Sequence, residues 1–204
     1  MVRYREGHRE RVRQEIIGSA SEVMRERGFD EATVGAVMKA VGLTHGGFYA
    51  HFPDKTAMLT AAMEAAFVES PKNFAFLAEM ARSQGDAGLV ARHYLGDQRV
   101  SDVASGCPAA ALVSETPRQD ASVRAAFQSG AEATVAALRT APGLSEDDGG
   151  TPWAALSMLV GGLTMMRAVP DPALARLIRE QIIVAMRKLA APRDNLPTTA
   201  KDHP

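Results

Sequence analysis

Residues 33–55 of this chain, TVGAVMKAVGLTHGGFYAHFPDK, are predicted to form two short helices joined by a tight turn. The first helix has an apolar face made by Val34, Val37, Met38 and Val41. Spacings of three and four residues place side chains on one side of an α-helix. Gly42 stands where the chain must turn, a position that often requires a positive φ. Two short helices joined by a glycine-containing turn are typical of a DNA-binding helix-turn-helix, whose second helix enters the major groove.

Polar residues mark the ends of these helices. Thr33 is expected to cap the first helix and Thr44 the second, while Asp54 caps the helix that follows. Gly46 and Gly47 lie inside the second helix, where each glycine costs about 1 kcal/mol relative to alanine. We expect that their lack of side chains lets the helix backbone lie close to DNA.

The candidate DNA contacts are concentrated in this motif. Thr44 and His45 begin the second helix, and His45 is the better candidate for reading a base edge. Polar groups at or just after that helix suit phosphate contacts; the alternative is an ordinary solvated surface. The complete candidate set is Thr33, Thr44, His45, Gly46, Gly47, Tyr49, His51 and Lys55.

The N-terminal segment is locally basic, although the whole chain has a net charge of −1. Residues 1–13 contain five arginines against two glutamates, a local net charge of +3. Clustered arginines beside a helix-turn-helix suit phosphate contacts or a minor-groove arm. A solvated, frayed N-terminus is the alternative, and both interpretations remain open for Arg3 and Arg5.

Residues 28–59 resemble the DNA-binding domain of the TetR/AcrR family of bacterial transcriptional regulators. The landmarks that carry the resemblance are Gly28-Phe29, Thr33, Val41-Gly42-Leu43-Thr44, Gly47-Phe48-Tyr49, His51-Phe52 and Lys55. The close match covers about a quarter of the chain, and residues 94–115 resemble, less specifically, the ligand-binding domain of one subgroup. The resemblance implies phosphate contacts at Tyr49, His51 and Lys55. It also implies an N-terminal three-helix DNA-binding domain and a C-terminal helical domain for ligand binding and dimerisation.

Composition agrees with an all-α fold, because the chain is 46% hydrophobic but only 5% aromatic, with Ala, Leu, Val and Met dominating. We expect a DNA-binding domain at residues 1–55, an effector-binding and dimerisation domain at residues 56–191, and a disordered tail at residues 192–204. Helices are expected at about residues 10–27, 54–67, 73–82 and 118–140. Pro71 should kink or interrupt the helical stretch between the second and third of these helices, and Pro108 should begin a further helix.

Two C-terminal segments bear on assembly. Residues 153–169 are apolar on nearly all sides, so the helix they form must be buried all round. Residues 171–190 have an apolar stripe at helical spacing. These helices either complete the core of one protomer or form a four-helix interface with a second copy. The resemblance favours the homodimer, and so does DNA recognition, since two copies can read half-sites about 34–36 Å apart.

Apolar and aromatic residues of the C-terminal part are candidates for lining an effector cavity, because such pockets are largely apolar. His93 and Tyr94 are the candidate polar anchors, although a core histidine is the expected state of His93. The candidate set is Phe67, Phe74, Met80, His93, Tyr94, Cys107, Phe127, Trp153, Met158 and Met165.

Cys107 is the single cysteine and precedes Pro108 at an expected helix N-terminus, where a thiolate is stabilised. The resemblance admits a thiol that senses electrophiles or oxidants. The sequence places no Lys or Arg nearer than Arg99 and Arg118. We therefore interpret Cys107 as a structural residue that flanks the cavity.

Several classes of function are excluded or unsupported. Cys107, His93 and Asp97 can be drawn as a nucleophilic set, but no nucleophile elbow or phosphate-binding loop accompanies them, so no enzyme is expected. The histidines are too scattered for a metal site, and no cofactor is expected. A polar N-terminus, the lack of an apolar span of about 20 residues, and one cysteine predict a cytoplasmic protein.

The sequence therefore predicts a homodimeric, ligand-responsive transcriptional regulator. We expect a repressor that a small, mainly apolar effector releases from a palindromic operator in double-stranded DNA. One alternative is an architectural DNA-binding protein without an effector, which would not need about 140 further residues of largely apolar helices. A thiol-based sensor of the same fold is the other alternative.

Overall fold

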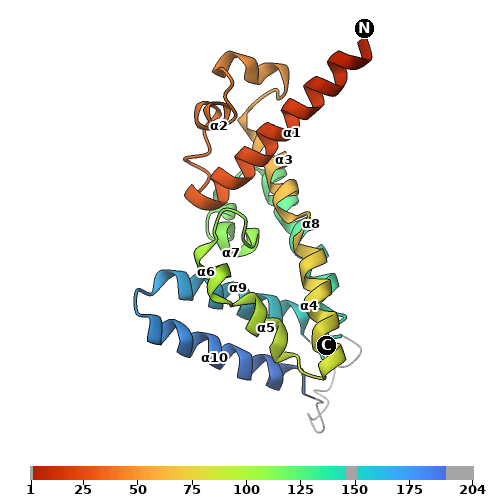
Figure 1. The fold of residues 1–204 in the computed structure, drawn as a ribbon, viewed down its shortest axis with the longest axis vertical. Coiled ribbons are helices and arrows are strands. Elements are labelled where there is room, and N and C mark those ends of the chain that lie inside the picture. The colour runs from red at the N-terminus through yellow and green to blue at the C-terminus, as the bar shows by residue number, and fades with distance from the viewer. Residues whose placement is uncertain (1, 146–150, 192–204) are drawn as a thin grey trace, which may run out of the picture.

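The computed structural model describes residues 2–145 and 151–191, with only the backbone for residues 2–6. Every regular element in these residues is helical, which confirms the predicted all-α class (Figure 1). The N-terminal elements are α1 (Val2–Arg27), α2 (Val34–Ala40), the 3₁₀ helix η1 (His45–Ala50) and α3 (Lys55–Phe67). The remaining elements are α4 (Ser70–Gln84), α5 (Gly88–Tyr94), α6 (Asp97–Ser101), α7 (Pro108–Leu112), η2 (Thr116–Arg118), α8 (Ala121–Leu138), α9 (Pro152–Ala168) and α10 (Pro172–Leu189).

Helix α1 begins eight residues earlier than the expected start at residue 10, because it already includes Val2. The backbone of the basic segment is therefore helical from Val2 onward, and its phosphate or minor-groove contacts stay a prediction. The helix ends as predicted. Gly28 has a φ of 87°, its N–H donates to the Met24 carbonyl at 2.9 Å, and Phe29 is buried.

The helix-turn-helix forms with one difference from the prediction. The Thr33 hydroxyl accepts from the Ala36 N–H at 3.1 Å, and Gly42 has a φ of 71°, so both expectations are confirmed. Asp54 caps α3 by accepting from the Ala57 N–H at 2.7 Å. The second helix, however, is a 3₁₀ helix, and Thr44 makes no side-chain cap bond. Two adjacent glycines in its first turn weaken the α-helical alternative.

The break near Pro71 is confirmed. Helix α3 ends at Phe67, and Pro71 lies in the first turn of α4, where its missing N–H needs no partner. Helix α4 begins at Ser70, earlier than the expected residue 73. Pro108 likewise begins α7, with Cys107 as its N-cap residue.

Two hydrophobic cores support the fold. The first joins the N-terminal half of the fold, α1 to α3, to the C-terminal half, α4 to α10. It contains the buried faces of α1, α2 and α3 together with Ala109, Leu112, Val123 and Ala126 from α7 and α8. In Figure 1, α8 runs alongside α3 and α4 for most of the length of the molecule. The second core joins α4, α5, α8, α9 and α10.

Helix α9 is not buried all round in the single chain, contrary to the expectation. Trp153 and Met165 are 48% and 55% exposed, while Leu163 on the opposite side is fully buried. Helix α10 exposes Leu174, Leu177 and Val184 in the same way. These two helices pack side by side at one end of the molecule (Figure 1). Among the described residues, no helix is long and apolar enough to cross a membrane.

Gly130 on α8 provides a test of the packing between the two halves. A Cβ built on Gly130 would lie 2.2 Å from Cγ of Phe67 on α3, so Gly130→Ala forces the helices apart. We expect it to lower the free energy of unfolding by about 1–3 kcal/mol, measured by denaturant titration. Gly18→Ala on α1 is the matched control, because nothing lies within 4 Å of its added Cβ. Gly18→Ala should raise the free energy of unfolding, because alanine favours a helix more than glycine does. Equal changes in the free energy of unfolding for the two variants would contradict this account of the packing.

Candidate functional site

The second helix of the helix-turn-helix is held from beneath by aromatic packing. Phe48 and Phe52 are buried and stack with ring centroids 5.7 Å apart. Tyr49 meets the Phe48 ring edge-on at 5.2 Å but remains 65% exposed. The apolar side chains thus fix η1, while the Tyr49 hydroxyl stays free to meet a partner.

The outer side of η1 carries the candidate base-reading residues. Thr44, His45 and Gly46 are exposed, and a Cβ at Gly46 would meet nothing within 4 Å. The protein itself therefore does not require glycine at position 46, which agrees with close approach of an external partner. Gly47 is half-buried against Met38 and so faces inward more than expected, whereas Thr33 is exposed but its hydroxyl is occupied by the capping bond.

Arginines of α1 border this surface. Arg13 lies over the Phe52 ring, 4.8 Å from its centroid, and Arg9 donates a hydrogen bond to the Ala50 carbonyl. His51 has a buried Nδ1 with no hydrogen-bond partner among the described residues. Burial lowers the pKa of His51, and the charges of Arg9 and Arg13 lower it further. The imidazole is therefore neutral at neutral pH, and any phosphate contact it makes is that of a neutral donor.

Lys55 is tied to its own domain. Its ammonium donates to the Phe29 carbonyl at 3.1 Å, and the Phe29 N–H donates to Glu115 Oε2 at 3.0 Å. An ammonium has three N–H donors, so two remain for a phosphate. The backbone of Phe29, in the turn after α1, is thus held twice: its carbonyl by Lys55 at the start of α3, and its N–H by Glu115 in the segment after α7.

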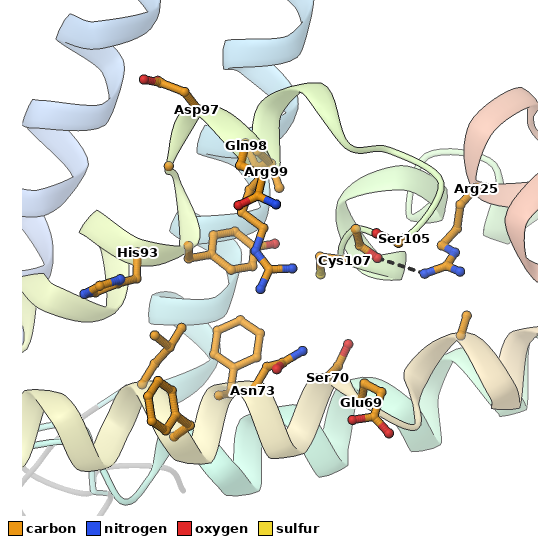
Figure 2. Close-up of a pocket in the computed structure, with 18 of the residues that line it drawn as sticks. Arg25, Glu69, Ser70, Asn73, His93, Asp97, Gln98, Arg99, Ser105 and Cys107 are labelled. Atoms are coloured by element: carbon orange, nitrogen blue, oxygen red, sulfur yellow. Dashed lines mark hydrogen bonds between the residues drawn. The ribbon is translucent and has the colours of Figure 1, made fainter.

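A cavity of about 630 Å³ lies in the C-terminal part, between α4, the α5–α6 segment and residues 105–107 (Figure 2). Its apolar lining is Phe74, Phe76, Leu77, Tyr94 and Leu163. Polar groups that line it include Arg25, Ser70, Asn73, Arg99, Ser105 and Cys107. The volume is that of a pocket for a small organic molecule.

The structure brings together four of the ten predicted cavity residues: Phe74, His93, Tyr94 and Cys107. His93 is exposed at the cavity and is not the core histidine that we expected. The other six lie outside the lining, because they pack elsewhere or face outward: Phe67, Met80, Phe127, Trp153, Met158 and Met165. Phe67 and Phe127, for example, pack edge-on with ring centroids 5.4 Å apart.

Tyr94 is the most unusual polar group of the cavity. Its hydroxyl is buried beside the Cys107 thiol, a weak acceptor, and makes no well-formed hydrogen bond with any described residue. Burial raises its pKa well above the usual range, and the neighbouring Cys107 thiol raises it further. The hydroxyl is therefore a neutral donor whose hydrogen bond remains to be made, a costly state for a buried group.

Sequence reasoning missed the two arginines of the cavity. Arg25 belongs to the last turn of α1, in the DNA-binding half. Its Nε donates to the Ser21 carbonyl at 3.0 Å and its Nη1 to the Gly106 carbonyl at 3.1 Å. Burial lowers the Arg25 pKa, partly offset by nearby carboxylates, first Glu22. No local pattern reveals such a residue, because it reaches the cavity across 81 residues of sequence.

Cys107 is half-buried and packs against both hydrophobic cores. The sequence shows no nearby cation, but the fold brings in Arg25 and Arg167; burial lowers the pKa of each guanidinium, and the neighbouring Cys107 only partly offsets that effect. Arg167 also donates to the backbone carbonyls of residues 99, 100 and 102. Within the described ranges, no three His, Cys, Asp or Glu side chains cluster as metal ligands would.

These features define a helix-turn-helix DNA-binding protein with a helical ligand-cavity domain. Residues 16–62 match the family model described as bacterial regulatory proteins, tetR family. The helix-turn-helix domain of this chain is therefore that of the TetR family of transcriptional regulators, whose members are DNA-binding proteins and not enzymes. A comparison with curated proteins found no similar sequence.

Solved structures share the whole fold at low sequence identity. The reduced form of NemR from E. coli superposes with a TM-score of 0.69 at 17% identity, covering 90% of this chain and 98% of NemR. The superantigen PfiT gives 0.61 at 22% identity, with 90% and 97% covered. The multidrug binding protein EbrR, complexed with imidazole, gives 0.57 at 20% identity, with 89% and 98% covered. These likenesses establish the fold alone.

Reaction of Cys107 with a maleimide separates its structural role from a sensing role. Because the thiol is half-buried against both cores, we expect slow modification under native conditions and unchanged DNA binding. Mass spectrometry gives the rate, and a gel-shift assay gives the affinity. Rapid modification that abolishes DNA binding in the wild type but not in Cys107→Ser would instead show a thiol sensor.

Proposed function

We propose that this TetR-family regulator is a homodimeric repressor that binds a palindromic operator and leaves it when a small molecule fills the cavity of Figure 2. The observation that carries the proposal is Arg25, since this charged residue of α1 also lines the cavity. A molecule in the cavity therefore touches the DNA-binding domain directly.

Further hydrogen bonds connect the two halves. The Thr56 hydroxyl at the start of α3 donates to Asp120 at 2.6 Å, and the Thr60 hydroxyl donates to Ser122 at 3.1 Å. Glu115 accepts from the Phe29 N–H on the other side of α3. Movement of α7 or α8 is thus transmitted to the helix-turn-helix. An effector shifts this equilibrium only by its difference in affinity for the two arrangements.

The site residues that support operator binding are the exposed Thr44, His45, Gly46 and Tyr49, together with Lys55. His45 is proposed to read a base edge, and Tyr49 and Lys55 to contact phosphates. For the effector, we propose Phe74, His93, Tyr94 and Cys107 of the predicted set. EbrR is described as a multidrug binding protein, which agrees with a cavity of this kind in this fold.

The exposed faces of α9 and α10 support the proposed homodimer. On α10, Leu174, Leu177 and Val184 recur on one side at helical spacing, and each is more than 40% exposed. On α9, Trp153 near the start of the helix and Met165 near its end are exposed, and Gly161 between them has open space beside it. Several exposed large apolar side chains on two neighbouring helices favour a protein interface, and a second copy would bury them.

The alternative of an architectural DNA-binding protein is less well supported, since such a protein needs neither the cavity nor the unpartnered Tyr94 hydroxyl inside it. A thiol sensor of the same fold has the placement of Cys107 beside Arg25 in its favour. The maleimide experiment distinguishes it from reversible binding.

Selection from random DNA duplexes tests the operator proposal. We expect a palindromic motif with half-sites about 34–36 Å apart and affinity that falls steeply with salt, because phosphates are neutralised. Tyr49→Phe should weaken binding equally across sequences, whereas His45→Ala should relax preference at particular positions by about 1–3 kcal/mol. The absence of any enriched motif would rule out sequence-specific regulation.

Replacement of an exposed leucine on α10 tests the homodimer. Leu177→Arg would bury an unpaired charge at the interface, so we expect it to give monomers by light scattering and to weaken operator binding. Val113→Arg is the control, because Val113 is 42% exposed but lies outside α9 and α10. Leu163 is unsuitable as a probe, since it is buried within the protomer. A wild-type monomer at micromolar concentration would refute the homodimer.

A further inference from the structure

The charges around the cavity are unequally paired. Two carboxylates line it, and each has a cationic partner of its own: Glu69 pairs with Lys72 at 2.7 Å, and Asp97 pairs with Arg179 at 2.7 Å. Asp97 also points away from the centre of the cavity in Figure 2. The negative charge of the lining is thus largely compensated by residues outside it.

The two arginines of the cavity have no such partner. Among the described residues, no carboxylate lies within ion-pair distance of Arg25 or Arg99, although Glu22 and Asp102 act on Arg25, and Asp102 on Arg99, through longer-range charge interactions. Both bonds of the Arg25 guanidinium go to backbone carbonyls, and they leave Nη2 without a partner. In Figure 2 the Arg99 side chain reaches into the middle of the cavity, and Arg25 lies at the end near Ser105 and Cys107. Positive charge therefore predominates inside.

The buried hydroxyl of Tyr94 is an independent second observation. It lines the same cavity, and its polar neighbour there is the Cys107 thiol, a weak acceptor that makes no well-formed hydrogen bond with it. An anionic oxygen is the strongest acceptor for such a donor, because charge-assisted hydrogen bonds are about twice as strong as neutral ones. One group that occupies this region would satisfy Tyr94 and compensate the arginines together.

The rest of the cavity is apolar. Phe74 packs against the Tyr94 ring with centroids 5.3 Å apart, and Leu77 and Leu163 complete this side. Along α4, Ser70 and Asn73 lie toward the Arg25 end, while His93 lies at the opposite end (Figure 2). The cavity therefore has a basic, hydrogen-bonding region and an apolar region.

We infer that the effector is a small organic anion, a carboxylate on an aromatic or similarly apolar body, bound by Arg25, Arg99 and the Tyr94 hydroxyl. This inference rests on the proposed function and replaces the mainly apolar effector with a charged one. Because Arg25 belongs to α1, the anion contacts the DNA-binding domain through a charged bond. Planar carboxylates match the fork of N–H donors that a guanidinium presents.

Three probes of nearly equal size and different charge test the inference: 2-naphthoate, its neutral amide 2-naphthamide, and the cation 2-naphthylmethylammonium. Titration calorimetry at neutral pH measures their affinities for the full chain. We expect 2-naphthoate to bind at least about tenfold more tightly than the amide, and the cation to bind least. Binding of the amide or the cation as tight as that of the carboxylate, or no binding of 2-naphthoate at millimolar concentration, would overturn the inference.

Variants assign the charge preference to residues. Arg99→Gln should bring the affinity for 2-naphthoate close to that for the amide without changing the amide's own affinity. Arg25→Gln should act in the same direction, but it also removes bonds to two carbonyls, so Arg99→Gln is the cleaner test. Arg124→Gln, an exposed arginine of α8 outside the lining, is the matched control and should change neither affinity. A preference for 2-naphthoate that survives both cavity variants would contradict the assignment.

Operator binding without any probe, measured on the same preparations, separates this inference from the proposed function. A protein that selects an operator but does not prefer the carboxylate disproves only the anionic effector. A protein that prefers the carboxylate but selects no operator disproves the repressor and leaves the cavity's specificity established.

Discussion

The packing of α3 against α8 is the contact on which the rest of the structure depends. Phe67 of α3 occupies the space that a side chain at position 130 would fill, and it packs edge-on against Phe127. This contact belongs to a core that also contains the buried faces of α1 and α2. The helix-turn-helix is therefore not a separate unit on a linker, because its own hydrophobic core continues into α7 and α8. Close packing of this kind transmits small displacements instead of absorbing them.

The cavity follows from the same arrangement. Helix α4 continues from α3 after the break at Pro71 and forms one wall, while the α5–α6 segment and residues 105–107 form the others. Arg25 reaches this space because α1 packs against α7, and its bond to Gly106 fixes the distance between them. Under the proposed function, a ligand in the cavity would therefore contact the DNA-binding domain through one side chain, Arg25. A regulator built this way needs no long pathway between its sites.

Local features of the fold were predictable because they depend on neighbouring residues alone. The Thr33 and Asp54 caps, the positive φ of Gly42, and the break at Pro71 were all confirmed. The errors have local causes as well. The second helix is 3₁₀ and lacks the Thr44 cap, and α1 continues through the arginine-rich segment to Val2. Helix periodicity marks where a helix must be buried, but not how far its solvated end extends.

The sequence by itself determined the helical class, the helix-turn-helix and the side of η1 that faces outward, since the spacing of apolar residues dictates which face is buried. Only the tertiary structure decided which side chains surround the cavity. Phe74, Tyr94 and Cys107 meet there, whereas Trp153 and Met165 remain on the outside of the chain. In the sequence, an apolar residue of the core cannot be told from an apolar residue of the cavity. Arg25 of α1 reaches the cavity only through contacts between residues distant in sequence. Composition and periodicity carry no record of such contacts, because they depend on how whole helices pack.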